Sequence, residues 1–409
     1  MQTTNYINRN FKKLTDMKKI INNTALIPLL LSCHENHSLQ KETYAHDTID
    51  IKKSIINQEK ILFSQYVESI NYYPVPTDHD YLIGKVGKLI VADSLFILMD
   101  NQITHSVFIF DKKGSRKSCI HQHGNGPTEY INLSDVYYNP NHQELGLYCN
   151  IKNRILYYDI NTGAYLREQK FPYKSDMIQL IGENVVQHTE YNENPDLEIN
   201  GLYPNLIYFT QKNPKMVIGK NYFKGPINRA LVTSSRGWFS LWNDTLSIKP
   251  DHCNIVYHCT KDSIFPAHFL DFGEYNIDER YWDKVMEKNI NAKKLNDYCQ
   301  SENLCETIWY MESENLIHFT CRQRGDLSRV IYSKKNKKGI RFKIFENDMD
   351  MIATFQPKTI SGNKLYGLLS SHNTVIFCNS VKQDLVPPIL KDIKEGDNPV
   401  IVEITLKDF

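Results

Sequence analysis

The amino-acid sequence predicts an all-β fold: a six-bladed β-propeller with four-stranded blades, an N-terminal latch strand and a short helical insertion. Three observations predict this fold. From about Tyr81 onward, short apolar stretches alternate with turn residues. Two groups of these stretches follow the same order 48 positions apart, at Asp111 and Asp159, which suits a four-stranded blade. The chain of 409 residues is also long enough to close one all-β ring.

The first group contains strands at residues 95–100 and 107–111, a turn at 112–114 and a returning strand at 116–120. An Asp precedes the turn and a Gly ends it, because Asp can cap backbone N–H groups and Gly can adopt a positive φ. The second group repeats this order in four segments: residues 144–149, 154–159, 161–163 and 164–171. The repetition predicts two consecutive blades.

Four later groups are less regular copies of the same unit. They consist of residues 184–189, 205–211 and 215–222; 238–242, 244–248 and 269–273; 306–313, 316–322, 329–333 and 339–345; and 352–355, 364–370 and 399–407. The early strand at residues 66–73 is predicted to pair into the last group and close the ring, since an open sheet edge invites aggregation. The count is six blades, with five or seven as alternatives.

One segment, residues 277–298, breaks the strand pattern. Trp282, Val285, Met286 and Ile290 follow one another at helical spacing with charges between them. We expect a helical insertion on one mouth of the propeller, acting either as packing cover or as a mobile lid. The basic run at residues 334–338 lies between two strand-like segments and is predicted to be a solvated hairpin tip.

The N-terminus predicts export. Lys18 and Lys19 precede an apolar run at residues 25–31, which is too short to span a bilayer but suits a signal peptide over residues 17–33. The sequence Leu30-Leu31-Ser32-Cys33 resembles a bacterial lipobox, which predicts lipidation of Cys33 and a membrane anchor. The alternative is a buried apolar segment with an incidental cysteine.

These boundaries divide the chain into four parts. Residues 1–16 are interpreted as an upstream extension from a misplaced start, residues 34–60 as a flexible tether and residues 61–409 as the propeller. The predicted location is the cell envelope, at the outer membrane, on either its periplasmic or its outer face. The 48 basic and 47 acidic residues nearly cancel, which argues against a nucleic-acid partner.

Four stretches together resemble the family of six-bladed propeller lipoproteins found in Bacteroides and related bacteria. They are residues 123–130 (HGNGPTEY), 63–74, 243–246 with 271–273, and 396–400. The first differs from the family's pattern because Thr128 replaces a glycine. The resemblance spans about residues 64–409 and implies a fold and an envelope location. It carries no agreed activity and no catalytic set.

Four residues are candidates for ligand binding. Asn125 and Glu129 are placed in the 123–130 stretch, where they either contact a ligand at the narrow mouth or, for Glu129, accept backbone N–H groups. Trp238 and Trp242 either stack on sugar rings or pack between blades.

The cysteines suggest disulfides rather than a metal. Cys253 with Cys259, and Cys299 with Cys305, are close enough in sequence to pair in an exported protein. His252 and His258 are expected on the strand face opposite these two thiols, and His121 with His123 lacks a visible third ligand, so no metal site is predicted. Buried free thiols are expected at Cys119, Cys149, Cys321 and Cys378.

The predicted function is a membrane-anchored binding or interaction module for a glycan, a peptide or an outer-membrane partner, with no cofactor and no assigned catalytic residue. Loops from all blades of a propeller converge at one mouth, which suits binding. The alternative is a propeller hydrolase or lyase with paired carboxylates of different pKa at the central mouth. A third alternative is a structural scaffold with an apolar plug.

Overall fold

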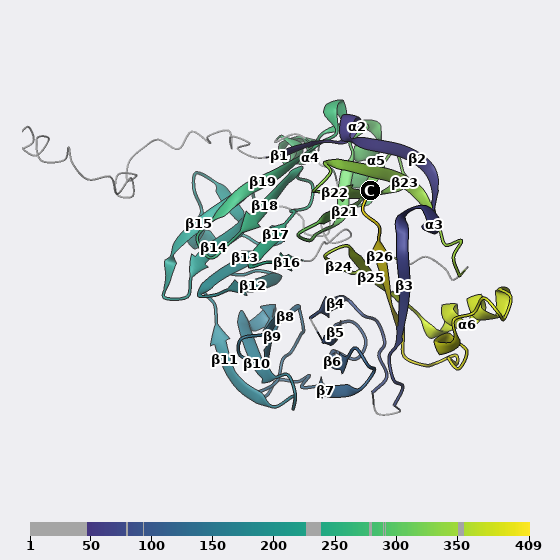
Figure 1. Ribbon diagram of the computed structural model, residues 1–409. Helices are drawn as coiled ribbons and strands as arrows, with labels where there is room; N and C mark the ends of the chain where they lie inside the picture. Colours follow the sequence, from purple (N-terminus) through teal and green to yellow (C-terminus); the bar gives the residue numbers. More distant parts are fainter. Residues whose placement is uncertain are drawn as a thin grey trace, which may run out of the picture. The chain divides into compact units, whose positions relative to one another are not determined.

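The computed structural model describes residues 47–78, 81–92, 94–225, 239–277, 280–288, 290, 292–350 and 356–409. Their strands form six sheets arranged as a ring around a common axis (Figure 1). Each sheet is one blade, and the innermost strands contact one another around the axis in five of the six pairs of neighbouring blades. The prediction of a six-bladed propeller is therefore confirmed.

The first three blades use four consecutive antiparallel strands each, in chain order from the axis outward. Blade 1 contains β4 (Lys88–Val91), β5 (Leu95–Asp100), β6 (Ser106–Asp111) and β7 (Arg116–Ile120). Blade 2 contains β8 (Asp135–Asn139), β9 (Glu144–Cys149), β10 (Arg154–Asp159) and β11 (Tyr165–Lys170). Blade 3 contains β12 (Met177–Ile181), β13 (Asn184–His188), β14 (Leu202–Thr210) and β15 (Asn213–Lys224).

The last three blades include strands from the N-terminal part of the chain. Blade 4 contains β16 (Ser240–Trp242), β17 (Thr245–Ile248), β18 (Ile255–Cys259) and β19 (Ile264–Asp271), with β1 (Asp47–Asp50) at its edge. Blade 5 contains β20 (Glu306–Glu312), β21 (Leu316–Gln323), β22 (Asp326–Ser333) and β23 (Lys338–Glu346), with β2 (Ile55–Leu62) at its edge. Blade 6 contains β24 (Thr359–Ser361), β25 (Lys364–Leu369), β26 (Val400–Leu406) and β3 (Val67–Pro74).

The ring closes through the predicted latch. Strand β3 pairs antiparallel with β26, with Pro74 opposite Val400 and Ile70 opposite Ile404. Val400, Val402 and Ile404 are buried in an apolar cluster with residues of blade 5. The latch therefore supplies the outermost strand of blade 6.

Residues 47–60 correct the predicted tether. They form β1, the short helix α2 (Ile51–Ser54) and the first part of β2, and we call residues 47–62 the strap. Strand β1 pairs parallel with β19, and β2 pairs parallel with β23. Ile49, Ile51 and Ile55 are buried, so the segment docks through isolated apolar side chains among polar neighbours. The purple segment in Figure 1 passes from blade 4 to blade 5 and then, through α3 (Phe63–Tyr66), to blade 6.

The three longer helices, α4 (Tyr281–Glu287), α5 (Ala292–Ser301) and α6 (Ser371–Ser380), lie on one face of the ring. Strands alternate in direction within a blade, so the connection after an outermost strand and the turn after a second strand lie on the same face. Helices α4 and α5 follow β19, and α6 follows β25. We call this side the helical face. Short 3-10 turns complete the elements: η1 (Asn150–Lys152), η2 (Pro195–Leu197), η4 (Gly273–Tyr275) and η5 (Pro388–Leu390).

The predicted insertion is thus two helices, and it is packed against blade 3. Tyr281, Val285 and Tyr298 are buried with Tyr191 and Phe223. This apolar contact supports the interpretation of the insertion as packing cover. In the part of the chain that the structure describes, no helix is long and apolar enough to cross a bilayer.

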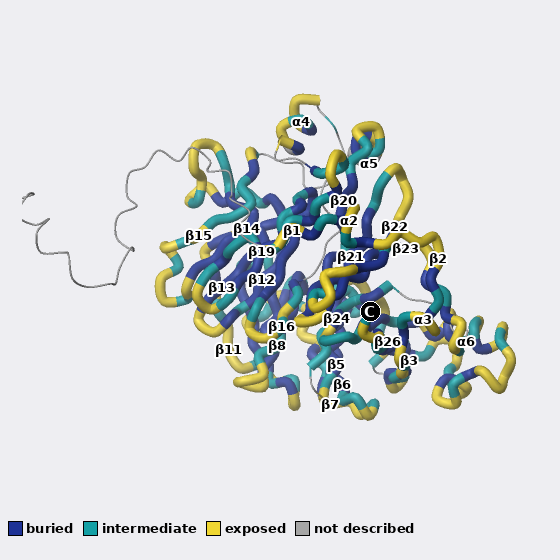
Figure 2. The backbone as a smooth tube through the Cα atoms, turned by 45° about the horizontal axis from the view of Figure 1, so that its top comes forward, coloured by how far each residue is buried: buried dark blue, intermediate teal, exposed yellow. Residues whose placement is uncertain are grey.

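The core lies between blades. Every residue of β9 is buried, and so are five of the six residues of β5, because strands inside a propeller have a sheet on both sides. Figure 2 shows this burial near the axis and exposure at the outer strands and loops. Residues 1–46, Trp238 and the predicted strand at residues 352–355 lie outside the described residues, as does the lipidation prediction for Cys33.

Candidate functional site

The 123–130 stretch forms a braced crossing between blades 1 and 2. Glu129 accepts a hydrogen bond from the Gly126 N–H at 2.7 Å. This agrees with the prediction that Glu129 accepts backbone N–H groups. A Cβ on Gly124 would lie 2.1 Å from the Glu129 carboxylate, so a larger residue here would require the Glu129 side chain to move. Asn125 is exposed and accepts from Lys152 at 2.8 Å. Ligand binding by Asn125 and Glu129 stays a prediction.

Three histidines gather beside this crossing. The ring of His105, from the turn after β5, stacks on His123 with centroids 4.5 Å apart. His121 Nδ1 lies 2.7 Å from the hydroxyl of Ser106, and His123 Nε2 lies 2.9 Å from the carbonyl of Ile131. The structure thus brings a third histidine to the pair seen in the sequence. Stacked rings do not direct their nitrogens at a common point, so the arrangement does not form a ligand set.

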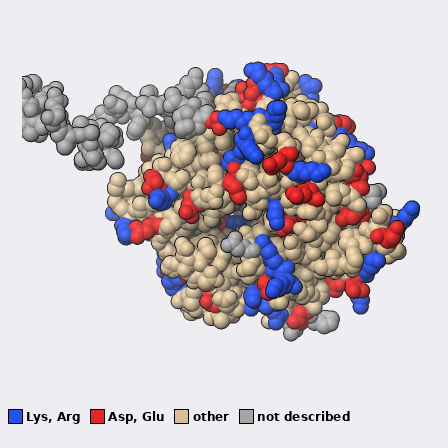
Figure 3. Space-filling view, viewed as in Figure 1, with Lys and Arg blue, Asp and Glu red and all other residues tan. Residues whose placement is uncertain are grey.

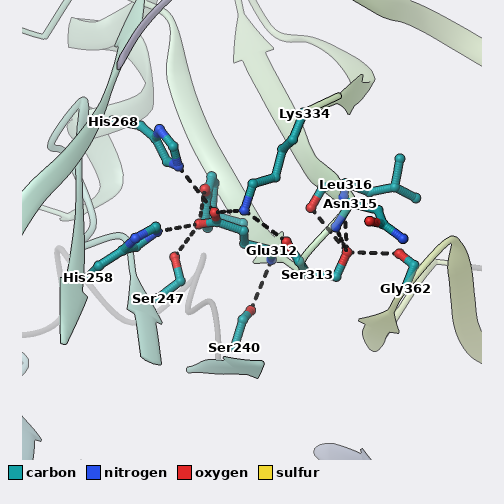
Figure 4. Close-up of polar contacts among 11 residues, drawn as sticks. Ser240, Ser247, His258, His268, Glu312, Ser313, Asn315, Leu316, Lys334 and Gly362 are labelled. Atoms are coloured by element: carbon teal, nitrogen blue, oxygen red, sulfur yellow. Dashed lines mark hydrogen bonds and ion pairs between the residues drawn. The ribbon is translucent and has the colours of Figure 1, made fainter. Parts of the chain in front are cut away.

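Trp242 belongs to a polar cluster at the seam between blades 4 and 5, on the face opposite the helices. We call it the Glu312 cluster, and it consists of Trp242, Ser247, His258, His268, Tyr310, Glu312 and Lys334 (Figure 4). Strands β16 to β19 supply four of these residues, β20 supplies Tyr310 and Glu312, and the hairpin after β22 supplies Lys334. The predicted hairpin tip therefore has one lysine that points inward.

The Glu312 carboxylate is at the centre of the cluster and its side chain is fully buried. Oε2 accepts from Ser247 Oγ at 2.6 Å and Tyr310 OH at 2.8 Å, and lies 2.9 Å from His258 Nε2. Oε1 accepts from Lys334 Nζ at 2.7 Å and lies 3.1 Å from His268 Nε2. Burial would raise the pKa of Glu312, but the two histidines outweigh burial and hold the pKa well below its usual 4.5. A carboxylate with five partners is a poor general base.

The same cluster contains a set of metal-ligand atoms. His258, His268 and Glu312 each offer one atom within 4.8 Å of the others, and two imidazoles with a carboxylate are ligands that Zn²⁺ uses. However, Lys334 already neutralises Glu312, and its Nζ lies 3.9 Å from the centroid of the Trp242 ring. A divalent cation would have to displace this ammonium group. The arrangement fits a neutralised buried carboxylate better than a resident metal.

A second polar cluster lies on the helical face beneath α4. We call it the Glu306 cluster, and it consists of His188, Glu190, Lys249, Asp251, His252, Glu306 and Arg322. Arg322 Nε donates to Glu306 at 2.7 Å, and His252 Nδ1 lies 3.0 Å from the same carboxylate. The His252 ring stacks on Tyr281 of α4 with centroids 5.0 Å apart. The helical insertion therefore covers this cluster.

The two central carboxylates of the Glu306 cluster differ in pKa. Burial raises the pKa of Asp251, and the charge of Glu190 adds to this effect. Burial also acts on Glu306, but His252 and Arg322 outweigh it and lower the pKa to about 2. Both residues are nearly inaccessible to solvent, with 4% and 3% exposure. The hydrolase alternative requires two carboxyl groups of different pKa, and Asp251 and Glu306 meet this requirement. Catalysis also requires that a substrate reach them, and both side chains are buried.

The cysteines that the structure describes are free thiols, so it bridges neither predicted pair. The Cys299 thiol lies 3.3 Å from Tyr281 OH, whereas Cys305 is buried with Cys321 under blade 5. Cys253 accepts from the Ile255 N–H at 3.4 Å, and Cys259 is buried in a separate apolar cluster. Neighbours in sequence thus pack into different environments.

An open groove of about 420 Å³ lies on the rim of blade 5, beside the connection from blade 4. We call it the rim groove, and its walls are Asn57, Gln58, Glu59, Tyr275, Gln323, Arg324, Asp326, Ser328, Arg341, Phe342 and Lys343. The strap supplies one wall.

Acidic and basic side chains are intermixed over the face of the molecule shown in Figure 3, so this face presents no field of a single sign.

Charges in the rim groove are unequally paired. Lys343 lies 3.4 Å from Glu59 and 3.2 Å from Asp326, so both acidic groups have a basic partner. Arg341 donates to Ser328 at 2.7 Å and Arg324 to Asn303 at 2.6 Å. In the described part of the chain, neither guanidinium has a carboxylate within ion-pair distance. The groove can therefore offer cationic hydrogen-bond donors to a ligand.

Sequence reasoning found Trp242 but missed its partners. Glu312, Lys334 and His268 are far apart in the sequence, and only the alignment of three strands and a hairpin brings them together. The rim groove was also missed, because residues 57–59 were assigned to a tether. The isolated isoleucines at positions 49, 51 and 55 could have indicated that this segment docks on the propeller.

The chain is a six-bladed propeller with two clusters of buried polar residues between its blades. The family model described as "Domain of unknown function (DUF4934)" matches residues 46–405. The chain belongs to this DUF4934 family. No curated protein matches the chain in sequence.

Two of the solved structures that are similar to this chain come from Bacteroides. One is a Bacteroides fragilis NCTC 9343 protein, described provisionally as exported, with a TM-score of 0.66 and 16% identity over 87% of this chain and 100% of that chain. The other is a member of the DUF4221 family from Bacteroides vulgatus ATCC 8482, with a TM-score of 0.47 and 14% identity over 83% of this chain and 97% of that chain. The first likeness confirms the fold inferred from the resemblance of the sequence stretches.

Proposed function

We propose that this protein is an exported, lipid-anchored propeller that binds a ligand in the rim groove without chemically changing it. The observation that carries the proposal is the groove itself. Its volume of about 420 Å³ lies in the range of ligand sites, and polar groups from three segments converge on it. Sites of this kind recognise ligands through a few placed hydrogen-bonding groups.

The groove chemistry favours a polar ligand with an anionic group. Asn57, Gln58 and Gln323 offer amide groups that can both donate and accept hydrogen bonds, as sugar hydroxyls require. Arg324 and Arg341 offer guanidinium groups that suit carboxylate or sulfate. Tyr275 adds an aromatic surface on which a sugar ring can pack. An acidic glycan is therefore our first candidate, and an acidic peptide or an outer-membrane protein is the alternative.

The envelope location follows from the N-terminal sequence. Lys18, Lys19, the apolar run and Cys33 together favour export and lipid anchoring. The similar Bacteroides fragilis protein, described provisionally as exported, agrees with this location.

The test is binding by the full chain to a panel of acidic and neutral oligosaccharides and acidic peptides. A ligand that binds the folded state raises the melting temperature with concentration, and titration calorimetry then gives its affinity. We expect a saturable shift with an acidic glycan, which Asn57→Ala and Arg324→Ala weaken at least about tenfold, since each removes a polar contact of roughly 1.4 kcal/mol or more.

Met216→Ala is the matched control, because Met216 is 72% exposed on blade 3 and lies outside the groove. It should bind like the natural chain. If no ligand of the panel shifts the melting temperature, or if the groove variants bind as well as the control, the proposal is wrong.

One observation favours an enzyme as the second candidate. Asp251 and Glu306 have pKa values shifted in opposite directions, as an acid–base pair requires. A propeller hydrolase or lyase would have to open the contact between Tyr281 and His252 to admit substrate. Release of product from an acidic glycan by the natural chain, and its loss in Asp251→Asn, would support this candidate over simple binding.

A further inference from the structure

Arg329 is a cation between blades 5 and 6 that lacks a counter-ion. It lies on β22, opposite Thr320 of β21 and Phe342 of β23, on the side that faces blade 6. Among the residues that the structure describes, no carboxylate lies within ion-pair distance of its guanidinium, and no acceptor takes a hydrogen bond from it. A partly buried guanidinium without compensation is costly, and arginine does not escape this cost by losing its proton.

The guanidinium borders a small cavity with apolar walls. The cavity has a volume of about 10 Å³ for a water-sized sphere and is lined by Phe63, His318, Arg329, Ile331, Phe342, Phe345, Pro357, Leu365 and Ile404. The residues come from blade 5, from blade 6 and from α3 between them. A volume of this size suits one water molecule or one small ion better than a polyatomic ligand.

Three further polar atoms around this position also lack a partner. His318 is 1% exposed and lines the cavity, and its Nδ1 is buried without a hydrogen bond. Thr320 Oγ1, on the residue paired with Arg329, and Gln356 Nε2, on the residue before Pro357, are buried without one as well. Each of these atoms can act as a donor, His318 through its Nδ1–H tautomer. Native structures leave few buried polar groups unpaired, so several at one place point to something that accepts from them.

The protonation of His318 agrees with this view. Burial lowers the pKa of His318 to about 3, and the charge of Arg329 contributes to the shift. The imidazole is therefore neutral at neutral pH, and Arg329 remains the single positive charge at the cavity. One negative charge is enough to balance it.

We propose that this cavity binds one small monovalent anion of the chloride type, held by Arg329 with His318, Thr320 and Gln356 as supporting donors. The cavity volume suits such an anion better than acetate, phosphate or sulfate. The aromatic and aliphatic walls suit a weakly hydrated halide better than a strongly hydrated ion. The anion would join blades 5 and 6 and α3, next to the latch that closes the ring.

The test compares thermal unfolding of the full chain in chloride, bromide and gluconate at constant ionic strength. Gluconate is too large for the cavity. We expect the melting temperature to be higher in both halides and to rise with the logarithm of halide concentration, as for any ligand of the folded state. Arg329→Met should abolish the halide dependence, and it should be at least as stable as the natural chain in gluconate, since it removes an uncompensated charge.

Arg116→Met is the control, because the Arg116 guanidinium lies on blade 1 against Asp78 and Tyr81. It should keep the full halide dependence. Crystals grown in bromide give a readout that does not depend on any variant, namely an anomalous peak within hydrogen-bond distance of Arg329. Equal melting temperatures in halide and gluconate, a halide effect that Arg329→Met retains, or a cavity holding only water would each overturn the proposal.

Discussion

Lys88 of blade 1 donates its ammonium group to the Asp135 carboxylate of blade 2 at 2.7 Å, and both side chains are buried at the axis of the ring. Lys88 also donates to the carbonyl of Val136 at 2.8 Å. The other carboxylate oxygen of Asp135 accepts from the Ile178 N–H of blade 3 at 3.2 Å. The ion pair and its hydrogen bonds thus connect the innermost strands of blades 1, 2 and 3.

Lys88→Met should be strongly destabilising, because it leaves the Asp135 carboxylate buried without its cation. We expect a loss of about 3–5 kcal/mol in the free energy of unfolding, measured by urea denaturation. Lys117→Met is the control, since the exposed pair of Lys117 and Asp111 at 3.6 Å should contribute about 1 kcal/mol or less. Equal losses in the two variants would contradict this account of the axis.

Glu306 should make the protein sensitive to acid. Its pKa in the folded state is about 2, below the ordinary 4.5, so its contribution to stability is present above pH 4.5 and is lost as pH falls towards 2. The difference corresponds to about 3 kcal/mol. Glu306→Gln should therefore show a flatter stability profile between about pH 5 and pH 2 than the natural chain.

The measurement for Glu306 is urea unfolding at a series of pH values. Glu302→Gln serves as the control, because Glu302 is an exposed partner of Lys288. The natural slope should persist in this control. A Glu306→Gln protein with the same acid slope as the natural chain would show that the carboxylate is already protonated or unpaired.

Removing Lys334 should create a metal site. In Lys334→Met, the carboxylate of Glu312 keeps two imidazole neighbours but loses its ammonium partner, so Zn²⁺ can take the vacated position. We expect Zn²⁺ to raise the melting temperature of Lys334→Met in a saturable way and to leave the natural chain unchanged. Adding His268→Ala to Lys334→Met should remove the effect. A zinc-dependent shift in the natural chain would instead mean that the metal displaces Lys334 unaided.

The strap can be tested with two adjacent isoleucines. Ile55 is 4% exposed and Ile56 is 61% exposed, although both lie in β2. Ile55→Ala should cost about 2–5 kcal/mol of unfolding free energy, while Ile56→Ala should change it by about 0.5 kcal/mol or less. Chemical denaturation measures both. Neutral behaviour of both variants would mean that residues 47–62 do not dock on blades 4 and 5 in solution.

Much of the fold was predictable because propeller blades repeat a local pattern. The strands at 107–111 and 154–159 end in Asp followed by a glycine turn, and the structure places β6 and β10 there. The strands that were not predicted include β4, β8 and β12, which are short. Each is the innermost strand of its blade, and this position follows from the ring rather than from the strand's own composition. Helix α6 was not predicted from the sequence, because its apolar residues are not gathered on one side of the helix.

The candidate sites were less predictable than the fold. Trp242 was a candidate for sugar stacking, and the structure instead places Lys334 over its ring. Glu312 and His268 come from different blades, and a single sequence carries no signal for such a meeting. The strap was mistaken for a tether because strands that pair at a sheet edge keep polar residues on their outer side, and β2 has five consecutive exposed residues.

The pairing of β3 with β26 also sets an order of events for the newly made chain. Residues 67–74 are synthesised long before their partner, residues 400–406. Until β26 is made, β3 has no partner in blade 6 and the ring cannot close. Contacts between such distant parts of a chain form slowly. Closure of the ring therefore depends on a single contact between two segments that lie at opposite ends of the propeller sequence.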